Sequence, residues 1–460
     1  ITFKTPFYRK ILEAIQRYSI YIGLGTAKQS ELKRESIANG IVVTTWRKSF
    51  QSLEFLSHDK GYTLAKGGLH SKDDPRVIWA NPGEALADPD VASMYPSFIV
   101  NYGVSPHHLS SKVFLGIVEW LRTTRLDAKH NGRKLEADAL KIVINRIYGA
   151  LNDAMDYLYD PECTYIVTIN LQLLLCNLIE SFELNGFDVL SANTDGLLIR
   201  RPNDRLDLFN HICKEWEDYS KLSLDTEVFE KYCRSAVNDY IAVGYGFYDA
   251  LQEYNRCGVW IDSKGNTYTT RQAIEDKFIK FKGYFLQDPE YNKGFVYPVV
   301  KKALKEYFLY GVDITEFIRN YINTSRTAIY DYCFSQKVAG KYTTIYKTVR
   351  DGKPVYIKCQ KHNRFYICKS GGGAITKAIV PDSDNIAYGD DISGIIVEEE
   401  KSLVAGQRVA LFNDYEYKED YNLNYGFYIN EAYKILYGNG KTGKGERRGI
   451  NNNSNNLFGW

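Results

Sequence analysis

The sequence predicts an α+β fold, because helical and strand-like patterns both occur in a chain that is large enough for a substantial core. Apolar residues recur at helical spacing from Lys112 to His130, and the turn signal Asn131-Gly132 separates this segment from a second helical one. The runs FDVLSA and GLLIRR flank a tight turn at residues 193–196, which is typical of a β-hairpin. With 460 residues, 44% of them hydrophobic, the chain can form about two to four domains.

The first elements along the chain are expected to be helices and short strands. Residues 1–60 combine basic helical patterns with a strand-like run, GIVVTTW. The Gly-rich stretch KGGLHS (66–71) predicts a turn or loop. Residues 86–100 are expected to form a strand end that runs into a turn at residues 95–96. Because Pro89 lacks a backbone N–H, this strand should bend or lie at a sheet edge there.

The next elements are longer helices. The helices predicted at about 112–130 and 133–151 should be antiparallel neighbours, since the loop between them is short. Another helix is expected at about 166–184, where an Asn-Gly pair ends it. Residues 286–437 mix helix and strand patterns. The tail, 438–460, is rich in Gly, Asn and Lys and is expected to be disordered.

Composition narrows the class of protein. The formal net charge is +2, but residues 277–361 hold 16 Lys and Arg against 7 Asp and Glu, which suits a phosphate-binding surface or a solvated basic face. Eight cysteines without C-x-x-C spacing give no zinc motif and fit a reducing compartment. No apolar run reaches about 18 residues, so no membrane span is expected and the location should be cytoplasmic, in the host-cell cytoplasm if the protein is viral.

Three polar segments stand out in chain order: D-V-A-S-M-Y-P-S from Asp90, K-I-V-I-N-R-I-Y-G from Lys141, and N-T-D-G at residues 193–196. Singly, each has an ordinary interpretation as a helix cap, an exposed polar helix face or a turn. Together they resemble motifs A, B and C of the family B DNA polymerases, whose phage-type branch often has N-T-D-G in the third. The resemblance extends to K-G-G-L-H, V-N-D-Y-I-A-V and I-K-F-K-G-Y-F, and thus covers about residues 66–285.

This resemblance implies an α+β right-hand polymerase fold with an antiparallel palm sheet, two-helix fingers and a mixed thumb. The implied activity is DNA-templated addition of deoxynucleotides to a primer 3′ end. The corresponding domains would be an N-terminal and template-side segment (1–85), a first part of the palm (86–110), a fingers helical hairpin (111–151), a second part of the palm (152–285), a thumb (286–437) and a disordered tail (438–460).

The resemblance assigns Asp90 and Asp195 as catalytic residues and metal ligands, and the Val91 carbonyl as a further ligand. Nucleotidyl transfer needs a deprotonated 3′-hydroxyl and a neutralised pyrophosphate, and two Mg²⁺ ions about 3.5–4 Å apart supply both. Mn²⁺ is the expected substitute. Asn193 stands where the strict family pattern has an aspartate, and an amide is a poorer Mg²⁺ ligand than a carboxylate. Asp195 rather than Asn193 is therefore expected to bind the metal.

A nucleotide site is also implied. Family members use the tyrosine that corresponds to Tyr95 as a steric gate against a 2′-hydroxyl. Lys141, Asn145 and Tyr148 fall at i, i+4 and i+7, within an arc of roughly 60° on one helix face. The remaining residues expected at the nucleotide are Ser93, Met94, Arg125 and Lys129.

Positive side chains on the two predicted helices would face the triphosphate. Arg125 and Lys129 stack on the first helix and Lys141 lies on the second, which matches cations to developing negative charge. Arg122 is a rival for Arg125, because R-T-T-R leaves the register open by one turn. A solvated basic face is the alternative interpretation.

The resemblance also implies contacts with primer-template DNA. The residues concerned are Gly67, Gly68, Thr194, Lys280, Lys282, Gly283 and Tyr284. A small residue at the template strand lets the backbone approach phosphate. A basic K-x-K-G segment would contact the new duplex, although such a strand is exposed by default.

Several expectations concern segments and partners. Only 89 residues precede Asp90 and they lack a D-x-E motif, so proofreading should reside on a separate exonuclease chain or on a removed N-terminal part. The chain has no initiator Met, so it is expected to be processed or cut from something longer. Intervals of 51 and 50 positions between the motifs leave no room for the insertions of protein-primed relatives, which predicts a nucleic-acid primer. The final NNLFGW resembles a sliding-clamp peptide, or is a non-functional apolar end.

Two other functions remain open from the sequence. A non-catalytic nucleic-acid-binding replication subunit is suggested by Asn193, Pro89 and the absent exonuclease motif. An RNA-templated or ribonucleotide polymerase is disfavoured by Tyr95. Magnesium-dependent extension of a labelled primer separates the first from a polymerase, and a comparison of templates and nucleotides separates the second.

Overall fold

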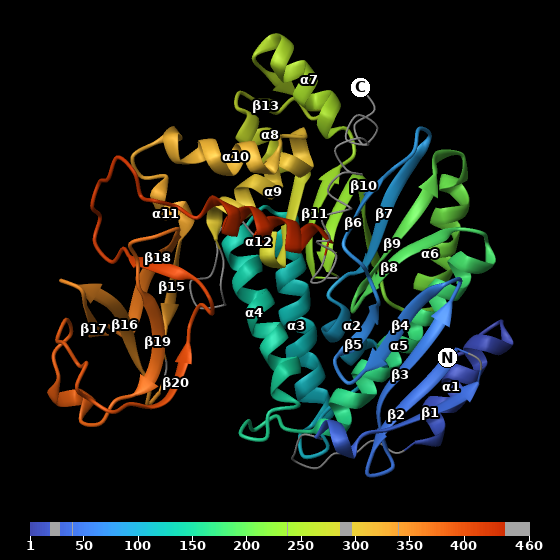
Figure 1. The fold of residues 1–460 in the computed structure, drawn as a ribbon. Helices are drawn as coiled ribbons and strands as arrows, with labels where there is room; N and C mark the ends of the chain where they lie inside the picture. Colours follow the sequence, from blue (N-terminus) through green and yellow to red (C-terminus); the bar gives the residue numbers. More distant parts are fainter. Residues whose placement is uncertain (19–27, 39, 237, 286–296, 339, 438–460) are drawn as a thin grey trace. The chain divides into compact units, whose positions relative to one another are not determined.

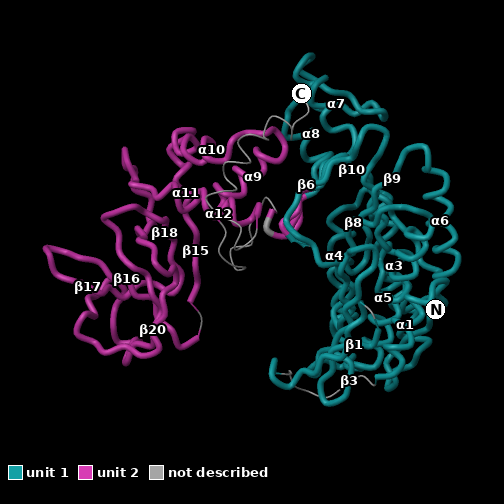
Figure 2. The backbone as a smooth tube through the Cα atoms, turned by 45° about the vertical axis from the view of Figure 1, so that its right-hand side comes forward, with its two compact units in different colours: residues 1–232, 236–238, 242–280 teal, residues 233–235, 239–241, 281–460 magenta. Residues whose placement is uncertain are grey.

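Figure 1 shows the fold in a computed structural model that describes residues 1–18, 28–38, 40–236, 238–285, 297–338 and 340–437. The chain forms two compact units, coloured separately in Figure 2. Unit 1 comprises residues 1–232, 236–238 and 242–280, and unit 2 comprises residues 233–235, 239–241 and 281–460. Each unit mixes helices with antiparallel sheet, which confirms the predicted α+β class.

A long sheet carries most of the strands of unit 1. Its path is β1-β2-β3-β4-β5-β8-β9-β7-β10-β11-β14, and β6 pairs with β10. A two-stranded sheet joins β12 and β13. The bounds are β1 (Lys33–Ala38), β2 (Ile41–Trp46), β3 (Ser49–Ser57), β4 (Lys60–Ala65), β5 (Gly68–Ser71), β6 (Arg76–Trp79), β7 (Glu84–Val91), β8 (Asp188–Asn193), β9 (Gly196–Pro202), β10 (Leu224–Ala236), β11 (Asp239–Gly244), β12 (Trp260–Ile261), β13 (Thr267–Tyr268) and β14 (Ile279–Lys282).

The helices of unit 1 include a central buried one, α5. It begins where Asp160 caps the backbone N–H of Cys163 and Pro161 takes the first helical position. Among the described residues α5 alone has the length and apolarity to cross a bilayer, and 78% of its most apolar window is buried, as in a core helix. The helices are α1 (Pro6–Arg17), α2 (Met94–Tyr102), α3 (Ser111–His130), α4 (Lys134–Ala150), α5 (Pro161–Leu184), α6 (Leu206–Ser220), α7 (Phe247–Cys257) and α8 (Arg271–Phe278).

The predicted helical hairpin and β-hairpin are confirmed as α3–α4 and β8–β9. The apolar positions that define α3 do not all face the core, however. Leu121 is buried, whereas Val113, Ile117 and Trp120 are 60%, 50% and 62% exposed. Periodicity therefore identified the helix but not the side that packs.

Two local predictions need correction, and one of the two alternatives for Pro89 is excluded. Residues 68–71 of KGGLHS form strand β5, and only the two residues before them turn. Tyr95 and Pro96 lie in the first turn of α2, where a proline costs no hydrogen bond. Finally, β7 lies between β9 and β10 and is no edge strand. It pairs with β9 at Ala87 and Asp90 but not between them, as the missing N–H of Pro89 requires.

Unit 2 combines helices with two small sheets, which confirms the mixed pattern predicted for its described part. One sheet has the order β15-β18-β21 and the other β17-β16-β19-β20. The predicted disorder and clamp peptide of the tail lie outside the described residues. The bounds are α9 (Pro298–Tyr310), α10 (Ile314–Asn320), the short 3-10 helix η4 (Tyr321–Thr324), α11 (Ile329–Tyr332), β15 (Cys333–Lys337), β16 (Thr343–Arg350), β17 (Lys353–Cys359), β18 (His362–Cys368), β19 (Ala374–Ile379), β20 (Glu398–Ser402), β21 (Arg408–Leu411) and α12 (Tyr425–Tyr437).

Candidate active site

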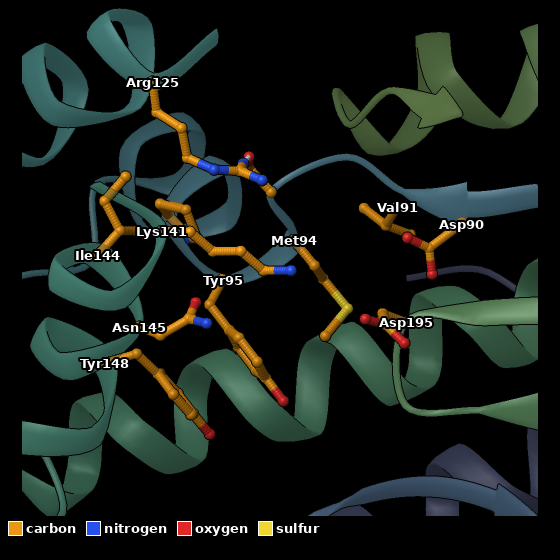
Figure 3. A pocket seen from close by; sticks show the side chains of 12 residues that line it. Asp90, Val91, Met94, Tyr95, Arg125, Lys141, Ile144, Asn145, Tyr148 and Asp195 are labelled. Carbon is orange, nitrogen blue, oxygen red and sulfur yellow. Dashed lines mark hydrogen bonds between the residues drawn. The ribbon is translucent and has the colours of Figure 1, made fainter. Parts of the chain in front are cut away.

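Asp90 and Asp195 are brought together by the pairing of β7 with β9. Asp90, near the end of β7, pairs with Gly196, the first residue of β9. Asp195 lies in the turn before Gly196, and its carbonyl accepts a hydrogen bond from the Val91 N–H at 2.7 Å. Figure 3 shows the two carboxylates beside each other on one side of the cavity. Residues 105 positions apart thus become neighbours at one end of the sheet.

A cavity of about 390 Å³ opens at this end of the sheet. It collects the predicted metal ligands and all the predicted nucleotide residues except Lys129 (Figure 3). The residues that line it are Asp90, Val91, Ser93, Met94, Tyr95, Pro96, Arg125, Lys141, Ile144, Asn145, Tyr148 and Asp195. Carboxylates therefore occupy one side of the cavity and cationic side chains from α3 and α4 another.

Acidic residues on β10 extend the carboxylate side, and the sequence did not single them out. Asp225 pairs with Asp90, and Glu227 pairs with Asp88. Since strand side chains alternate, these four carboxylates belong to one face of the sheet. Lys129 makes an ion pair with Asp225 at 3.2 Å and does not line the cavity. The lysine predicted to meet a triphosphate thus meets a carboxylate beside Asp90.

Arg125 is held at the cavity by the turn between β7 and α2. Ser93 adopts a left-handed conformation (φ 49°) before α2, and its hydroxyl accepts a hydrogen bond from the Arg125 guanidinium. The Nε of Arg125 is buried and has no hydrogen-bond partner among the described residues. Arg122 instead pairs with Glu119 on its own helix at 2.8 Å. Of the two arginines that the sequence left open, the structure places Arg125 at the cavity.

The floor of the cavity contains two stacked tyrosines. The rings of Tyr95 and Tyr148 lie 3.9 Å apart at 11°. The Tyr148 hydroxyl lies 2.6 Å from Thr168 Oγ1, which donates to the Thr164 carbonyl of α5. Burial is the main cause that raises the pKa of both phenols above the ordinary value. Thr168, which no motif contained, thereby fixes the Tyr95–Tyr148 stack to the core helix.

Lys141 is the most accessible cation of the cavity. It is exposed on α4, one turn before Asn145. It makes no ion pair with any residue that the structure describes. Its ammonium group is therefore available to an anionic ligand.

The turn that contains Asp195 rests on β5. The Thr194 N–H donates to the Leu69 carbonyl at 2.7 Å, and Thr194 Oγ1 lies 3.1 Å from His70 Nε2. A Cβ on Gly68, whose φ is 141°, would come within 3.1 Å of the Thr194 methyl group. A Cβ on Gly67 would meet nothing within 4 Å. Gly68 therefore packs against the turn, whereas Gly67 faces open space.

Two further polar residues surround that turn. The Asn193 amide donates to Asn238 Oδ1 at 3.0 Å, so its side chain is engaged away from the carboxylate pair. His70, the last residue of K-G-G-L-H, has a pKa below the ordinary histidine value, chiefly because it is half-buried. The nearby charge of Asp195 opposes that shift. His70 is thus neutral near pH 7.

The remaining basic segment is partly engaged within the protein. Lys280 makes an ion pair with Glu227. The Lys282 ammonium lies 5.7 Å from the centre of the Tyr240 ring, and Gly283 has a φ of 61°. Of Tyr284 only the backbone is described. None of these residues lines the cavity.

The candidate metal ligands are suited to a hard cation. Mg²⁺ takes oxygen ligands, and the Asp90 and Asp195 carboxylates with the Val91 carbonyl are such donors. One group of three possible ligands occurs elsewhere in the described chain, where His107, Asp160 and Cys163 lie within 4.8 Å of one another. The Asp160 carboxylate there accepts hydrogen bonds from His107, so this group ties a loop to the start of α5.

Comparisons with known proteins find sequence similarity to DNA polymerases. A DNA polymerase of Thermococcus gorgonarius is 27% identical over 190 residues, which are 34% of this chain and 24% of that protein. DNA polymerase II of Escherichia coli K12 is 25% identical over 170 residues, 31% of this chain and 22% of that protein. The chain is therefore similar, at low identity and over about a third of its length, to these DNA polymerases. It matches about a quarter of the length of these relatives.

A solved family B DNA polymerase from Pyrobaculum calidifontis is 12% identical, with a TM-score of 0.40. That match covers 80% of this chain and 47% of the other. No protein-family model matches the chain.

Proposed function

We propose that the chain is a DNA-templated DNA polymerase that extends a primer 3′ end by two-metal nucleotidyl transfer. The observation that carries this proposal is that Asp90 and Asp195 face Arg125 and Lys141 within one cavity. Phosphoryl transfer depends on positioning and on matching charge, and this cavity offers cation-binding oxygens opposite phosphate-binding cations.

The reacting groups have distinct sites in this proposal. Asp90, Asp195 and the Val91 carbonyl would hold two Mg²⁺ ions, which supply charge neutralisation and an activated 3′-hydroxyl. Arg125 and Lys141 would bind the triphosphate. Arg125 is pre-oriented by Ser93, and a donor that needs no reorganisation is the more effective one.

The tyrosine stack supplies the sugar specificity in this proposal. The ring of Tyr95 would lie under the deoxyribose, where a 2′-hydroxyl has no space. Tyr148 holds that ring in place from α4, while Asn145 and Met94 complete the surface around the nucleotide. Deoxynucleoside triphosphates and primer-template DNA are the substrates.

The right-hand domains follow in the same proposal. The β7–β9 region would be the palm, and the α3–α4 hairpin would be the fingers. The described helices and sheets of residues 286–437 would be the thumb. The N-T-D-G turn favours the phage-type branch of the family.

Primer extension tests the function. Wild-type protein should extend a labelled primer with Mg²⁺ and should stop when the metal is chelated, and matched and mismatched 3′ ends report on proofreading. Asp90→Asn and Asp195→Asn should each abolish extension without loss of fold. Asp188→Asn is the matched control, because this exposed carboxylate begins β8 outside the cavity. Near-normal extension by either cavity variant would overturn the proposal.

The same assay separates the alternative function. A wild-type chain that binds primer-template DNA but never extends it would be a non-catalytic replication subunit. Asn193 favours this alternative, because it stands where the family pattern has an aspartate and its amide donates a hydrogen bond to Asn238.

A further inference from the structure

Unit 2 contains a second cavity, of about 490 Å³, that none of the proposed functional residues lines. Its volume is in the range of small-ligand sites. It lies between the end of α10 with η4 and the segment just before α12. The lining residues are Arg319, Ile322, Asn323, Ser325, Arg326, Tyr417, Lys418, Glu419, Asp420, Tyr421, Leu423 and Tyr425.

The walls of this cavity are fixed by contacts between distant segments. The Tyr415 hydroxyl donates to the Arg326 carbonyl at 3.2 Å, which joins the two sides. Tyr421 is buried and packs against Tyr366 and Phe412, with ring centres 5.9 Å apart in both pairs. The Asn422 amide donates to Ser370 at 2.7 Å. A ligand would therefore meet a preformed surface.

Two guanidinium groups give the cavity its anion-binding character. Neither Arg319 nor Arg326 makes an ion pair with a residue in the described parts of the chain. Lys418, in contrast, pairs with Glu416 at 3.2 Å. Arginine is the side chain best suited to bind phosphate through two parallel hydrogen bonds. Two such arginines in one cavity thus indicate a phosphate-bearing ligand.

The remaining lining suits a nucleobase. Arg326 lies 5.6 Å from the centre of the Tyr417 ring, and Tyr417 as a residue is 58% exposed, so its ring is accessible for stacking. Asp420 accepts the Asn422 N–H at 2.7 Å and is engaged in its own loop. Glu419 has no hydrogen-bond partner among the described residues. A carboxylate can accept a hydrogen bond from the exocyclic amino group of a base. A free phosphate ion would use neither the ring nor Glu419.

We propose that this cavity binds one nucleotide residue of an unpaired DNA strand. Its phosphate lies on Arg319 and Arg326, and its base stacks on Tyr417. In the proposed function this unpaired strand would be the template. That assignment rests on the proposed function, whereas binding of the strand needs no catalysis.

The test uses the full chain and a short fluorescent single-stranded DNA that carries bromodeoxyuridine. The Arg319→Gln/Arg326→Gln double variant should bind this DNA about tenfold more weakly. The slope of affinity against salt should become shallower by about 0.7 for each phosphate that the variant no longer neutralises. At a DNA concentration below the wild-type dissociation constant, ultraviolet crosslinking to the peptide that contains Tyr417 should fall about tenfold in the same variant. Arg350→Gln is the matched control, since Arg350 is exposed on β16 and outside the cavity.

Three results would overturn the inference. The first is wild-type affinity in the double variant with an unchanged thermal unfolding curve. The second is a Tyr417 crosslink that keeps its wild-type yield in that variant at the same low DNA concentration. The third is competition by thymidine monophosphate or inorganic phosphate that equals competition by the strand. Primer extension by the wild-type chain is measured beside these assays. If the wild-type chain does not extend a primer but the double variant still loses strand binding, the proposed function is rejected and this binding site is retained.

Discussion

Replacing Gly196 by alanine should impair catalysis far more than folding. A Cβ at this position would lie 3.0 Å from Asp90 Oδ1 and 3.3 Å from both Asp88 Oδ1 and the Pro89 carbonyl. These distances are shorter than ordinary carbon–oxygen contacts, so the Asp90 carboxylate must shift by a few tenths of an ångström. Functional groups need placement within about 0.5 Å, and a displacement of about 1 Å can cost roughly a hundredfold in rate. We therefore expect about a tenfold lower kcat, equivalent to about 1.4 kcal/mol.

Steady-state primer extension with saturating nucleotide measures this effect, and urea denaturation reports the free energy of unfolding. Gly394→Ala is the matched control, because a Cβ there would meet nothing within 4 Å. A wild-type kcat for Gly196→Ala would refute the reasoning, since it would mean that the position of Asp90 against β9 does not limit the reaction. A loss of folding stability large enough to account for the lower rate would refute it equally.

Four other changes have defined outcomes. Tyr95→Val should raise ribonucleotide incorporation, and an unchanged ratio in competition assays would exclude the gate. Phe182→Ala empties a fully buried site in α5 and should lower the free energy of unfolding by about 3–5 kcal/mol in urea. Gly116→Ala, in the exposed middle of α3, should raise it by about 0.5–1 kcal/mol. Hydrogen bonding to Asp160 raises the pKa of His107, so their pairing stabilises the fold below the ordinary histidine pKa. This contribution disappears as the pH rises through the raised value, and thermal unfolding from about pH 6 to about pH 8 should show it in wild type but not in His107→Gln.

The site could be predicted where its residues lie in short segments with recognisable order. Asp90, Tyr95 and Lys141 belong to such segments, and the structure gathers them in one cavity. The β-hairpin around Asp195 was predictable because alternating apolar residues and a tight turn determine it locally. These features need only neighbours within about ten positions.

The remaining features depend on long-range pairing. Asp225 becomes a neighbour of Asp90 only when β10 joins β7, and no spacing in the sequence indicates this. Thr168 supports Tyr148 only because α4 packs near α5. The side of α3 that faces solvent could not be predicted from the sequence either. Periodicity defines an apolar stripe but not the element that packs against it, and Trp120 is exposed.

The contact between Gly68 and Thr194 links recognition to chemistry. A nucleic-acid backbone that pressed on the open surface at Gly67 would push on strand β5, and through Gly68 on the turn that carries Asp195. In the proposed function, template occupancy would then set the alignment of Asp195, a proposed metal ligand, before any nucleotide arrives.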